Sequence, residues 1–139
     1  MKILVDTTVW IDFFNGISSP SRFRLRELLQ AEEEVCVSSY ILTETLQGFK
    51  HDRDFEIATK HFLDLPILEL TIPDGYINAA RLYRTCRKRG LTIRKTADCL
   101  IAQTAIEHSV PLLHNDKDFD GIASVSNLQV FAINAYGKA

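Results

Sequence analysis

The stretch Lys2-Ile3-Leu4-Val5-Asp6-Thr7-Thr8-Val9-Trp10-Ile11-Asp12 opens the chain and decides its fold. Three apolar residues, Ile3 to Val5, run directly into an acid, which predicts a short buried strand with Asp6 at its carboxyl end. Either of the two following threonines can cap a helix that continues to about residue 15. Ligands of open α/β sheets bind at the carboxyl ends of the strands, so Asp6 is either a functional acid or a plain turn or capping residue.

The rest of the chain repeats this alternation of strand and helix. Short apolar runs predict further strands at residues 35–37, 67–70, 110–113 and 128–133, and amphipathic segments between them predict helices. Strands that alternate with helices pair in parallel through right-handed crossovers. The pattern therefore predicts the α/β class, with one domain over residues 1–139 and a central parallel sheet of four to five strands.

Composition excludes several classes of protein. Hydrophobic residues make up 46% of the 139 residues and charged residues 24%, which is typical of a globular domain. No apolar run approaches the roughly 18 residues of a membrane span, and the first apolar run stops at Asp6, which does not suit a signal peptide. The three widely spaced cysteines, Cys36, Cys86 and Cys99, form neither a zinc pattern nor a disulfide framework. We therefore expect a cytoplasmic protein that has no membrane partner.

Four acids occupy positions that sequence patterns normally give to apolar or capping residues. Asp6 and Asp116 each follow a predicted buried strand, whereas Glu44 and Asp98 lie in early turns of helices with apolar neighbours. A carboxylate in apolar surroundings costs several kcal/mol unless it is paired or bound to a cation. Separate capping roles account for three of these acids, but Glu44 lies past the capping positions.

Convergence of the four acids would require a cation. A divalent metal is the simplest way to offset the mutual repulsion of the carboxylates, and ligation by oxygen alone favours Mg²⁺ or Mn²⁺ over Zn²⁺. The sequence therefore predicts a metal site formed by Asp6, Glu44, Asp98 and Asp116, in preference to four unrelated caps.

Four motifs, in order along the chain, resemble those of PIN domains, specifically the VapC-type toxin ribonucleases of toxin–antitoxin pairs. The matching pieces are the opening stretch, Thr43-Glu44, Thr96-Ala97-Asp98-Cys99-Leu100-Ile101-Ala102 and Leu113-His114-Asn115-Asp116-Lys117-Asp118-Phe119. The resemblance covers essentially the whole chain. It implies a parallel sheet with helices on both faces, a Mg²⁺- or Mn²⁺-dependent RNA endonuclease, a homodimer, and a VapB-type antitoxin that inserts a segment into the active site.

The resemblance also implies roles for single residues. Asp6, Glu44 and Asp98 match the three central acids of the family. Asp116 and Asp118 both lie where relatives place a fourth acid, and Asp116 is preferred because it is nearer the strand end. Thr8 matches a position that often carries a hydroxyl beside the first acid, and could bind a water on the metal or a phosphate oxygen.

Basic residues are dense between residues 81 and 95. We expect Arg94 and Lys95, which lie closest to Asp98 in sequence, to contact RNA, with Arg87 and Lys88 as further contacts in a salt-dependent interaction. The alternative is a solvated helix face, or an electrostatic partner for an acidic antitoxin.

Two other functions compete with the nuclease. An acid after the first strand also suits an aspartyl-phosphate phosphatase, but that family has a second Asp at the position of Thr8, and Glu44 would have no role. The other alternative is a catalytically silent PIN-like domain that binds RNA or protein. The presence of every acid in the family pattern argues against it.

Overall fold

A four-stranded parallel sheet lies at the centre of the protein, whose computed structural model describes residues 1–31 and 33–132. The strands are β1 (Lys2–Val5), β2 (Glu34–Ser38), β3 (Ile67–Leu68) and β4 (Leu112–Leu113). Their order across the sheet is β3-β2-β1-β4, and every neighbouring pair is parallel. All four carboxyl ends therefore meet at one edge of the sheet, as the alternation of strand and helix predicts.

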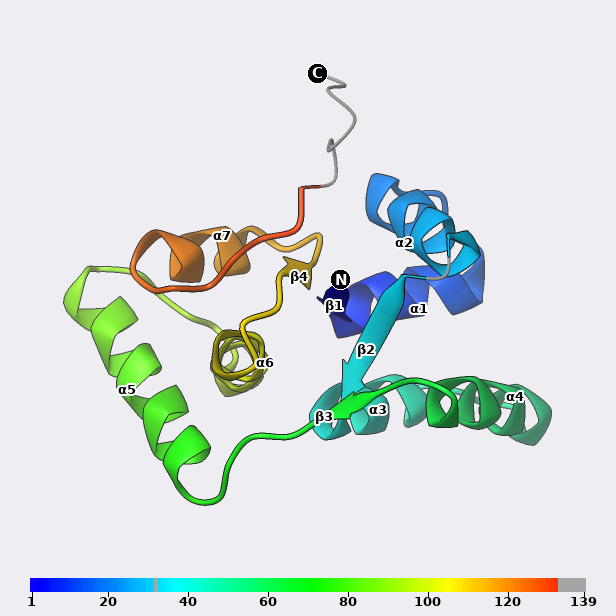
Figure 1. The fold of residues 1–139 in the computed structure, drawn as a ribbon, viewed down its shortest axis with the longest axis horizontal. Coiled ribbons are helices and arrows are strands. Elements are labelled where there is room, and N and C mark those ends of the chain that lie inside the picture. Colours follow the sequence, from blue (N-terminus) through cyan, green and yellow to red (C-terminus); the bar gives the residue numbers. More distant parts are fainter. Residues whose placement is uncertain (32, 133–139) are drawn as a thin grey trace.

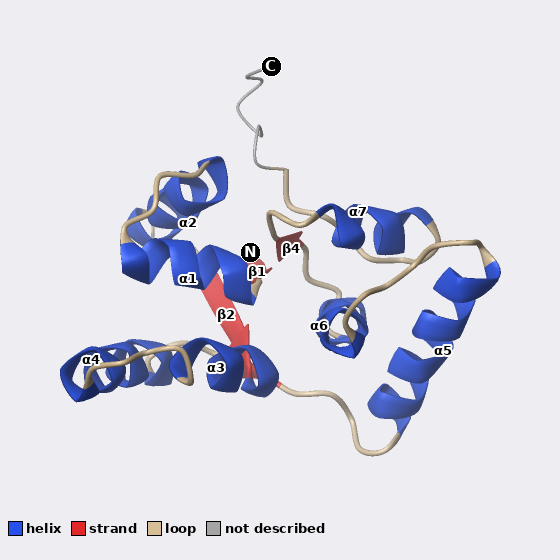
Figure 2. Cartoon of the chain, turned by 180° about the vertical axis from the view of Figure 1, so that it is seen from behind, coloured by secondary structure: helices blue, strands red, loops and turns tan. Residues whose placement is uncertain are grey.

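Seven helices cover the sheet in the described part of the chain. They are α1 (Thr7–Asn15), α2 (Pro20–Gln30), α3 (Ser39–Leu46), α4 (Asp52–Leu63), α5 (Asp74–Lys88), α6 (Thr96–Glu107) and α7 (Lys117–Ser124). Figure 1 shows α1 to α4 on one side of the strands and α5 to α7 on the other, and the reverse view in Figure 2 shows the same two groups. The expected arrangement of helices on both faces is confirmed.

The first strand is the most deeply buried part of the sheet. Ile3, Leu4 and Val5 are fully buried, because β1 has a partner on each side and helices over both faces. Leu4 pairs with Cys36 of β2 on one side and with Leu112 of β4 on the other. A continuous apolar run is what a strand with no solvent-facing side requires.

The opening helix anchors the fold through an aromatic cluster. Trp10 is fully buried and its ring centroid lies 5.0 Å from that of Phe62 on α4, in an edge-to-face arrangement. Phe14 stacks on the same indole at 5.9 Å. The acid at the end of β1 is thereby fixed to a helix that packs firmly on the core.

The predicted fifth strand is wrong. Residues 128–132 form a single parallel bridge, between Val130 and Leu112, and residue 133 lies outside the described residues. The bridge has two hydrogen bonds, Leu112 N–H to Gln129 O and Phe131 N–H to Leu112 O, each 2.8 Å long. Gln129 and Val130 are exposed, so this segment is not buried as a full strand would be.

Smaller differences concern the ends of elements. The apolar runs predicted four residues each for strands three and four, but β3 keeps only the first two and β4 only the last two. The three cysteines are free and buried, as expected. Within residues 1–31 and 33–132, no helix combines the length and apolar character that crossing a membrane requires.

Candidate functional site

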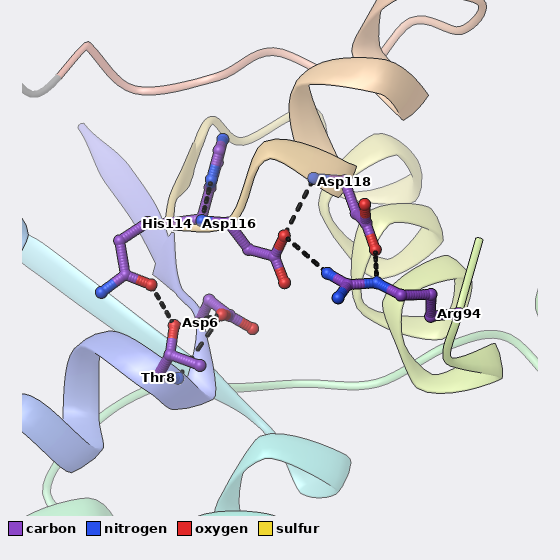
Figure 3. A network of polar contacts seen from close by, with 7 residues as sticks. Asp6, Thr8, Arg94, His114, Asp116 and Asp118 are labelled. Carbon is purple, nitrogen blue, oxygen red and sulfur yellow. Dashed lines mark hydrogen bonds and ion pairs between the residues drawn. The ribbon is translucent and has the colours of Figure 1, made fainter. Parts of the chain in front are cut away.

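Acids from three elements gather at the carboxyl edge of the sheet. Asp6 follows β1, Asp116 follows β4, and Asp98 lies in the first turn of α6. The backbone pairing of β1 with β4 continues into this site, since Asp6 N–H donates to Leu113 O at 2.9 Å. In Figure 3 the side chains of Asp6 and Asp116 point into the same space. The parallel sheet thus brings together residues that are more than a hundred positions apart.

Asp6 is both a buried acid and the cap of α1. Its carboxylate accepts hydrogen bonds from Thr8 N–H at 3.4 Å and from Thr8 Oγ1 at 2.8 Å, and the residue is only 3% exposed. The expectation that a threonine caps this helix is wrong, because the acid itself takes the N-cap position. Burial raises the pKa of Asp6, although the hydrogen bonds from Thr8 oppose that shift.

Asp98 is the acid whose environment is least favourable for a charge. The residue is 4% exposed, and its buried Oδ2 has no hydrogen-bond partner within the described residues. Burial raises the pKa of Asp98 to about 6; the charge of Lys95 lowers it, and those of Asp6, Asp116 and Asp118 raise it further. An orphaned buried carboxylate oxygen that faces other acids is well suited to bind a cation.

Two acids from the start of α7 complete the cluster. Single carboxylate oxygens of Asp98, Asp116 and Asp118 all lie within 4.8 Å of one another, a spacing that one metal ion could bridge. Asp116 is also the N-cap of α7, since its Oδ1 accepts from Asp118 N–H at 2.9 Å. The sequence left a choice between Asp116 and Asp118 for the fourth acid. Here both lie beside Asp98.

Glu44 stands apart from these three acids. It is partly exposed on α3, which corrects the expectation that it is buried among apolar residues. Its Oε1 accepts a hydrogen bond of 2.5 Å from Thr7 Oγ1, and its charge adds to the shift that raises the pKa of Asp6. Tyr40, one turn earlier, flanks the same space; burial, followed by the charge of Glu44, raises the pKa of its hydroxyl.

Comparison with known proteins identifies the family. The PIN domain profile matches residues 3–125. The chain is 35% identical over 128 residues to the ribonuclease VapC11 of Mycobacterium tuberculosis, covering 91% of this chain and 96% of that protein. It belongs to the PIN domain family of VapC ribonucleases. This membership argues against the aspartyl-phosphate phosphatase.

Solved structures agree on the fold. The chain superposes on VapBC2 of Rickettsia felis, bound to a DNA fragment from its promoter, with a TM-score of 0.72 and 22% identity, over 94% of this chain and 98% of that one. A toxin–antitoxin complex from Klebsiella pneumoniae gives a TM-score of 0.67 at 22% identity, over 92% and 99% of the two chains. At this level of identity, the structures support the PIN fold alone.

Arg94, one of the predicted RNA contacts of this PIN domain, forms ion pairs with two of the acids. Arg94 Nε lies 3.1 Å from Asp118 Oδ2, and Arg94 Nη2 lies 3.7 Å from Asp116 Oδ1 (Figure 3). These carboxylates raise the pKa of Arg94, which stays charged. Lys95 is exposed and close enough to Asp98 to lower the pKa of that acid. Arg87 instead lies over the Tyr83 ring at 5.8 Å, and its neighbour Lys88 ends α5.

Asn115 was missed as a site residue by the sequence reasoning. Asn115 joins three segments: its Oδ1 accepts from Thr8 Oγ1 at 2.6 Å, and its Nδ2 donates to Asp12 at 3.3 Å and to Ser21 at 3.2 Å. A hydroxyl has one hydrogen, so Thr8 serves either Asp6 or Asn115 at any moment. Asn115 has no sequence signal of its own beyond its place in the motif that contains Asp116.

Proposed function

We propose that this VapC-family protein is a Mg²⁺- or Mn²⁺-dependent endoribonuclease and acts as the toxin of a toxin–antitoxin pair. The observation that carries the proposal is the buried, unpartnered Oδ2 of Asp98 within a group of three converging acids. Stability alone would select against such a carboxylate, because it is buried with one oxygen that has no hydrogen-bond partner. A bound divalent cation would supply the missing partner.

The residues present fit such an ion. Asp98, Asp116 and Asp118 would hold it directly, and Asp6 and Glu44, whose charges act on this group, would be further ligands, direct or through water. Bound Mg²⁺ or Mn²⁺ lowers the pKa of a water molecule and stabilises negative charge on phosphoryl oxygens, which is the chemistry that phosphodiester hydrolysis needs. Thr8 keeps the Asp6 carboxylate turned toward this space, and Thr7 does the same for Glu44.

Arg94 and Lys95 would guide the RNA backbone to the acids. Arg94 is paired with Asp116 and Asp118, and those carboxylates would turn to a cation once it binds. The guanidinium would then be released to a phosphate beside the scissile bond, a group that Arg recognises well. Arg87 and Lys88 would extend this positive path along α5.

Partners and location belong to the same proposal. The Rickettsia and Klebsiella relatives are solved as VapBC and toxin–antitoxin complexes, which supports a VapB-type antitoxin for this chain. A homodimer, a single domain over residues 1–139 and a cytoplasmic location are further parts of the proposal. They follow from the family resemblance and the composition.

The direct test is cleavage of total RNA by the purified protein. We expect cleavage with Mg²⁺ or Mn²⁺, none in EDTA, and recovery when excess metal is restored, with the new RNA ends read by sequencing. An Asp6→Asn variant with an unchanged circular dichroism spectrum should be inactive. Cleavage that survives both EDTA and this substitution would refute a metal-dependent nuclease. Metal binding without cleavage of any RNA would instead support the silent RNA- or protein-binding alternative.

Arg94→Gln is expected to tighten Mn²⁺ binding by several-fold. The guanidinium competes with an incoming cation for Asp116 and Asp118, and its removal eliminates that competition. The effect is modest because Arg94 is well exposed, where charge interactions are screened. Isothermal titration with Mn²⁺ measures it. Arg87→Gln is the matched control, since that side chain lies over Tyr83 and should leave the affinity unchanged.

A further inference from the structure

His114 is a buried residue at the end of β4, directly before the turn that carries two of the acids. It is 5% exposed, and its ring packs against Phe119 of α7 with centroids 5.1 Å apart. Its Nδ1 accepts a hydrogen bond of 3.0 Å from the backbone N–H of Asp116 (Figure 3). The ring therefore accepts a hydrogen bond from the backbone of an acid, in addition to packing in the core.

The two ring nitrogens have different surroundings. Nδ1 carries no hydrogen, because it accepts from the Asp116 amide. In a neutral ring the hydrogen is then on Nε2, which lies 3.3 Å from Asp120 Oδ1 on α7 but makes no hydrogen bond within the described residues. The hydrogen bond from the Asp116 amide thus sets the tautomer of the imidazole.

Asp116 in turn accepts a hydrogen bond from the next acid, Asp118. With its backbone fixed, Asp116 accepts from Asp118 N–H at 2.9 Å and begins α7. The residue whose amide donates to the ring is therefore also the N-cap of the helix that carries Asp118. Partners of this kind, which touch ligands and not the metal, commonly set metal affinity in metalloproteins.

We propose that His114, which packs on Phe119 and accepts from the Asp116 amide, is the positioning residue that directs Asp116 and Asp118 toward Asp98. The proposal rests on the proposed metal-dependent function. It goes beyond that function by giving a role to a residue outside the group of acids that would hold the metal. A residue that only fills the core would be replaceable by any side chain of similar volume.

Three substitutions separate positioning from core filling. His114→Asn places an amide oxygen where Nδ1 accepts, His114→Gln extends its polar group toward Nε2, and His114→Leu removes both. By titration calorimetry, we expect the Asn variant to bind Mn²⁺ within about threefold of the unmodified protein. We expect the Gln and Leu variants to bind about 10- to 100-fold more weakly. Thermal unfolding without metal records the effect on the core separately.

The outcomes are distinguishable. If the unmodified protein binds no Mn²⁺, the proposed function fails and the positioning role fails with it. If it binds Mn²⁺ and all three folded variants bind equally well, only the positioning role is overturned. Nitrogen NMR of the labelled imidazole tests the role without any substitution. A hydrogen on Nε2 with Nδ1 as acceptor is expected, and a hydrogen on Nδ1 would overturn the role even if the Gln and Leu variants do not fold.

Discussion

Asp98→Asn should abolish RNA cleavage and, at the same time, make the protein more stable when no metal is present. Loss of residues that merely support a metal ligand commonly costs 10- to 100-fold in affinity or activity, so loss of a central acid should cost more than about 100-fold. The stability gain follows from burial. Asn is neutral, has nearly the same shape, and removes a charge that has no partner at Oδ2.

The size of the gain follows from the pKa of Asp98, which burial raises to about 6. At pH 8 this carboxyl is ionised in both folded and unfolded chains, and the folded state bears the cost of the buried charge. We expect Asp98→Asn to raise the free energy of unfolding by about 1 to 3 kcal/mol at pH 8. Urea denaturation in EDTA measures this. An unchanged or lower stability would show that the buried charge is already compensated.

Glu107→Gln is the matched control on the same helix. Glu107 accepts hydrogen bonds from Thr71 N–H at 2.9 Å and from Thr71 Oγ1 at 2.8 Å, so its charge is used in folding. We expect this variant to lose up to about 1 kcal/mol of stability and to cleave RNA normally. The contrast would separate an acid kept for function from an acid kept for structure.

Much of the fold was predictable because local patterns and global topology agree. The run Ile3-Leu4-Val5 is apolar on both sides of the strand, and β1 does have neighbours and helices on both sides. The third apolar run was predicted to form a strand over residues 67–70, but β3 ends before Glu69 and lies at the sheet edge. The predicted strand from Leu128 is wrong, since an apolar composition does not specify how many residues pair with a neighbouring strand.

The position of the candidate site was predictable for the same reason, but its internal arrangement was not. Parallel strands end at one edge, so acids that follow β1 and β4 must be close. Whether Asp116 or Asp118 faces Asp98 depends on the capping geometry of α7, which brings both into the cluster. The ion pairs of Arg94 join segments that sequence spacing cannot relate.

Saturating Mn²⁺ is expected to stabilise the protein strongly, and more at pH 8 than at pH 5. Binding to the folded state at 100 times the dissociation constant adds about 2.7 kcal/mol to the free energy of unfolding. Asp98 must lose its proton to bind a cation, and below its pKa of about 6 the proton competes with the metal. Thermal unfolding with and without Mn²⁺ at both pH values measures the effect.

Without metal, the contribution of Asp98 to stability has the opposite pH dependence and decreases as the pH rises. The folded-state pKa of Asp98 lies above its unfolded value of 3.8, so the folded state binds this proton more tightly. The stability that the proton provides is complete below about pH 4 and is lost as the pH rises through about 6.

His61 opposes this trend, because burial lowers its pKa and makes its protonation unfavourable in the folded state. Subtracting the curve of Asp98→Asn removes the His61 contribution, which both proteins share. The free energy of unfolding of the unmodified protein minus that of Asp98→Asn should then fall as the pH rises from 4 to 8 in EDTA. Mn²⁺ should reverse the sign of this trend. A difference that does not change with pH would mean that Asp98 ionises without cost and that the cluster is not poised for a cation.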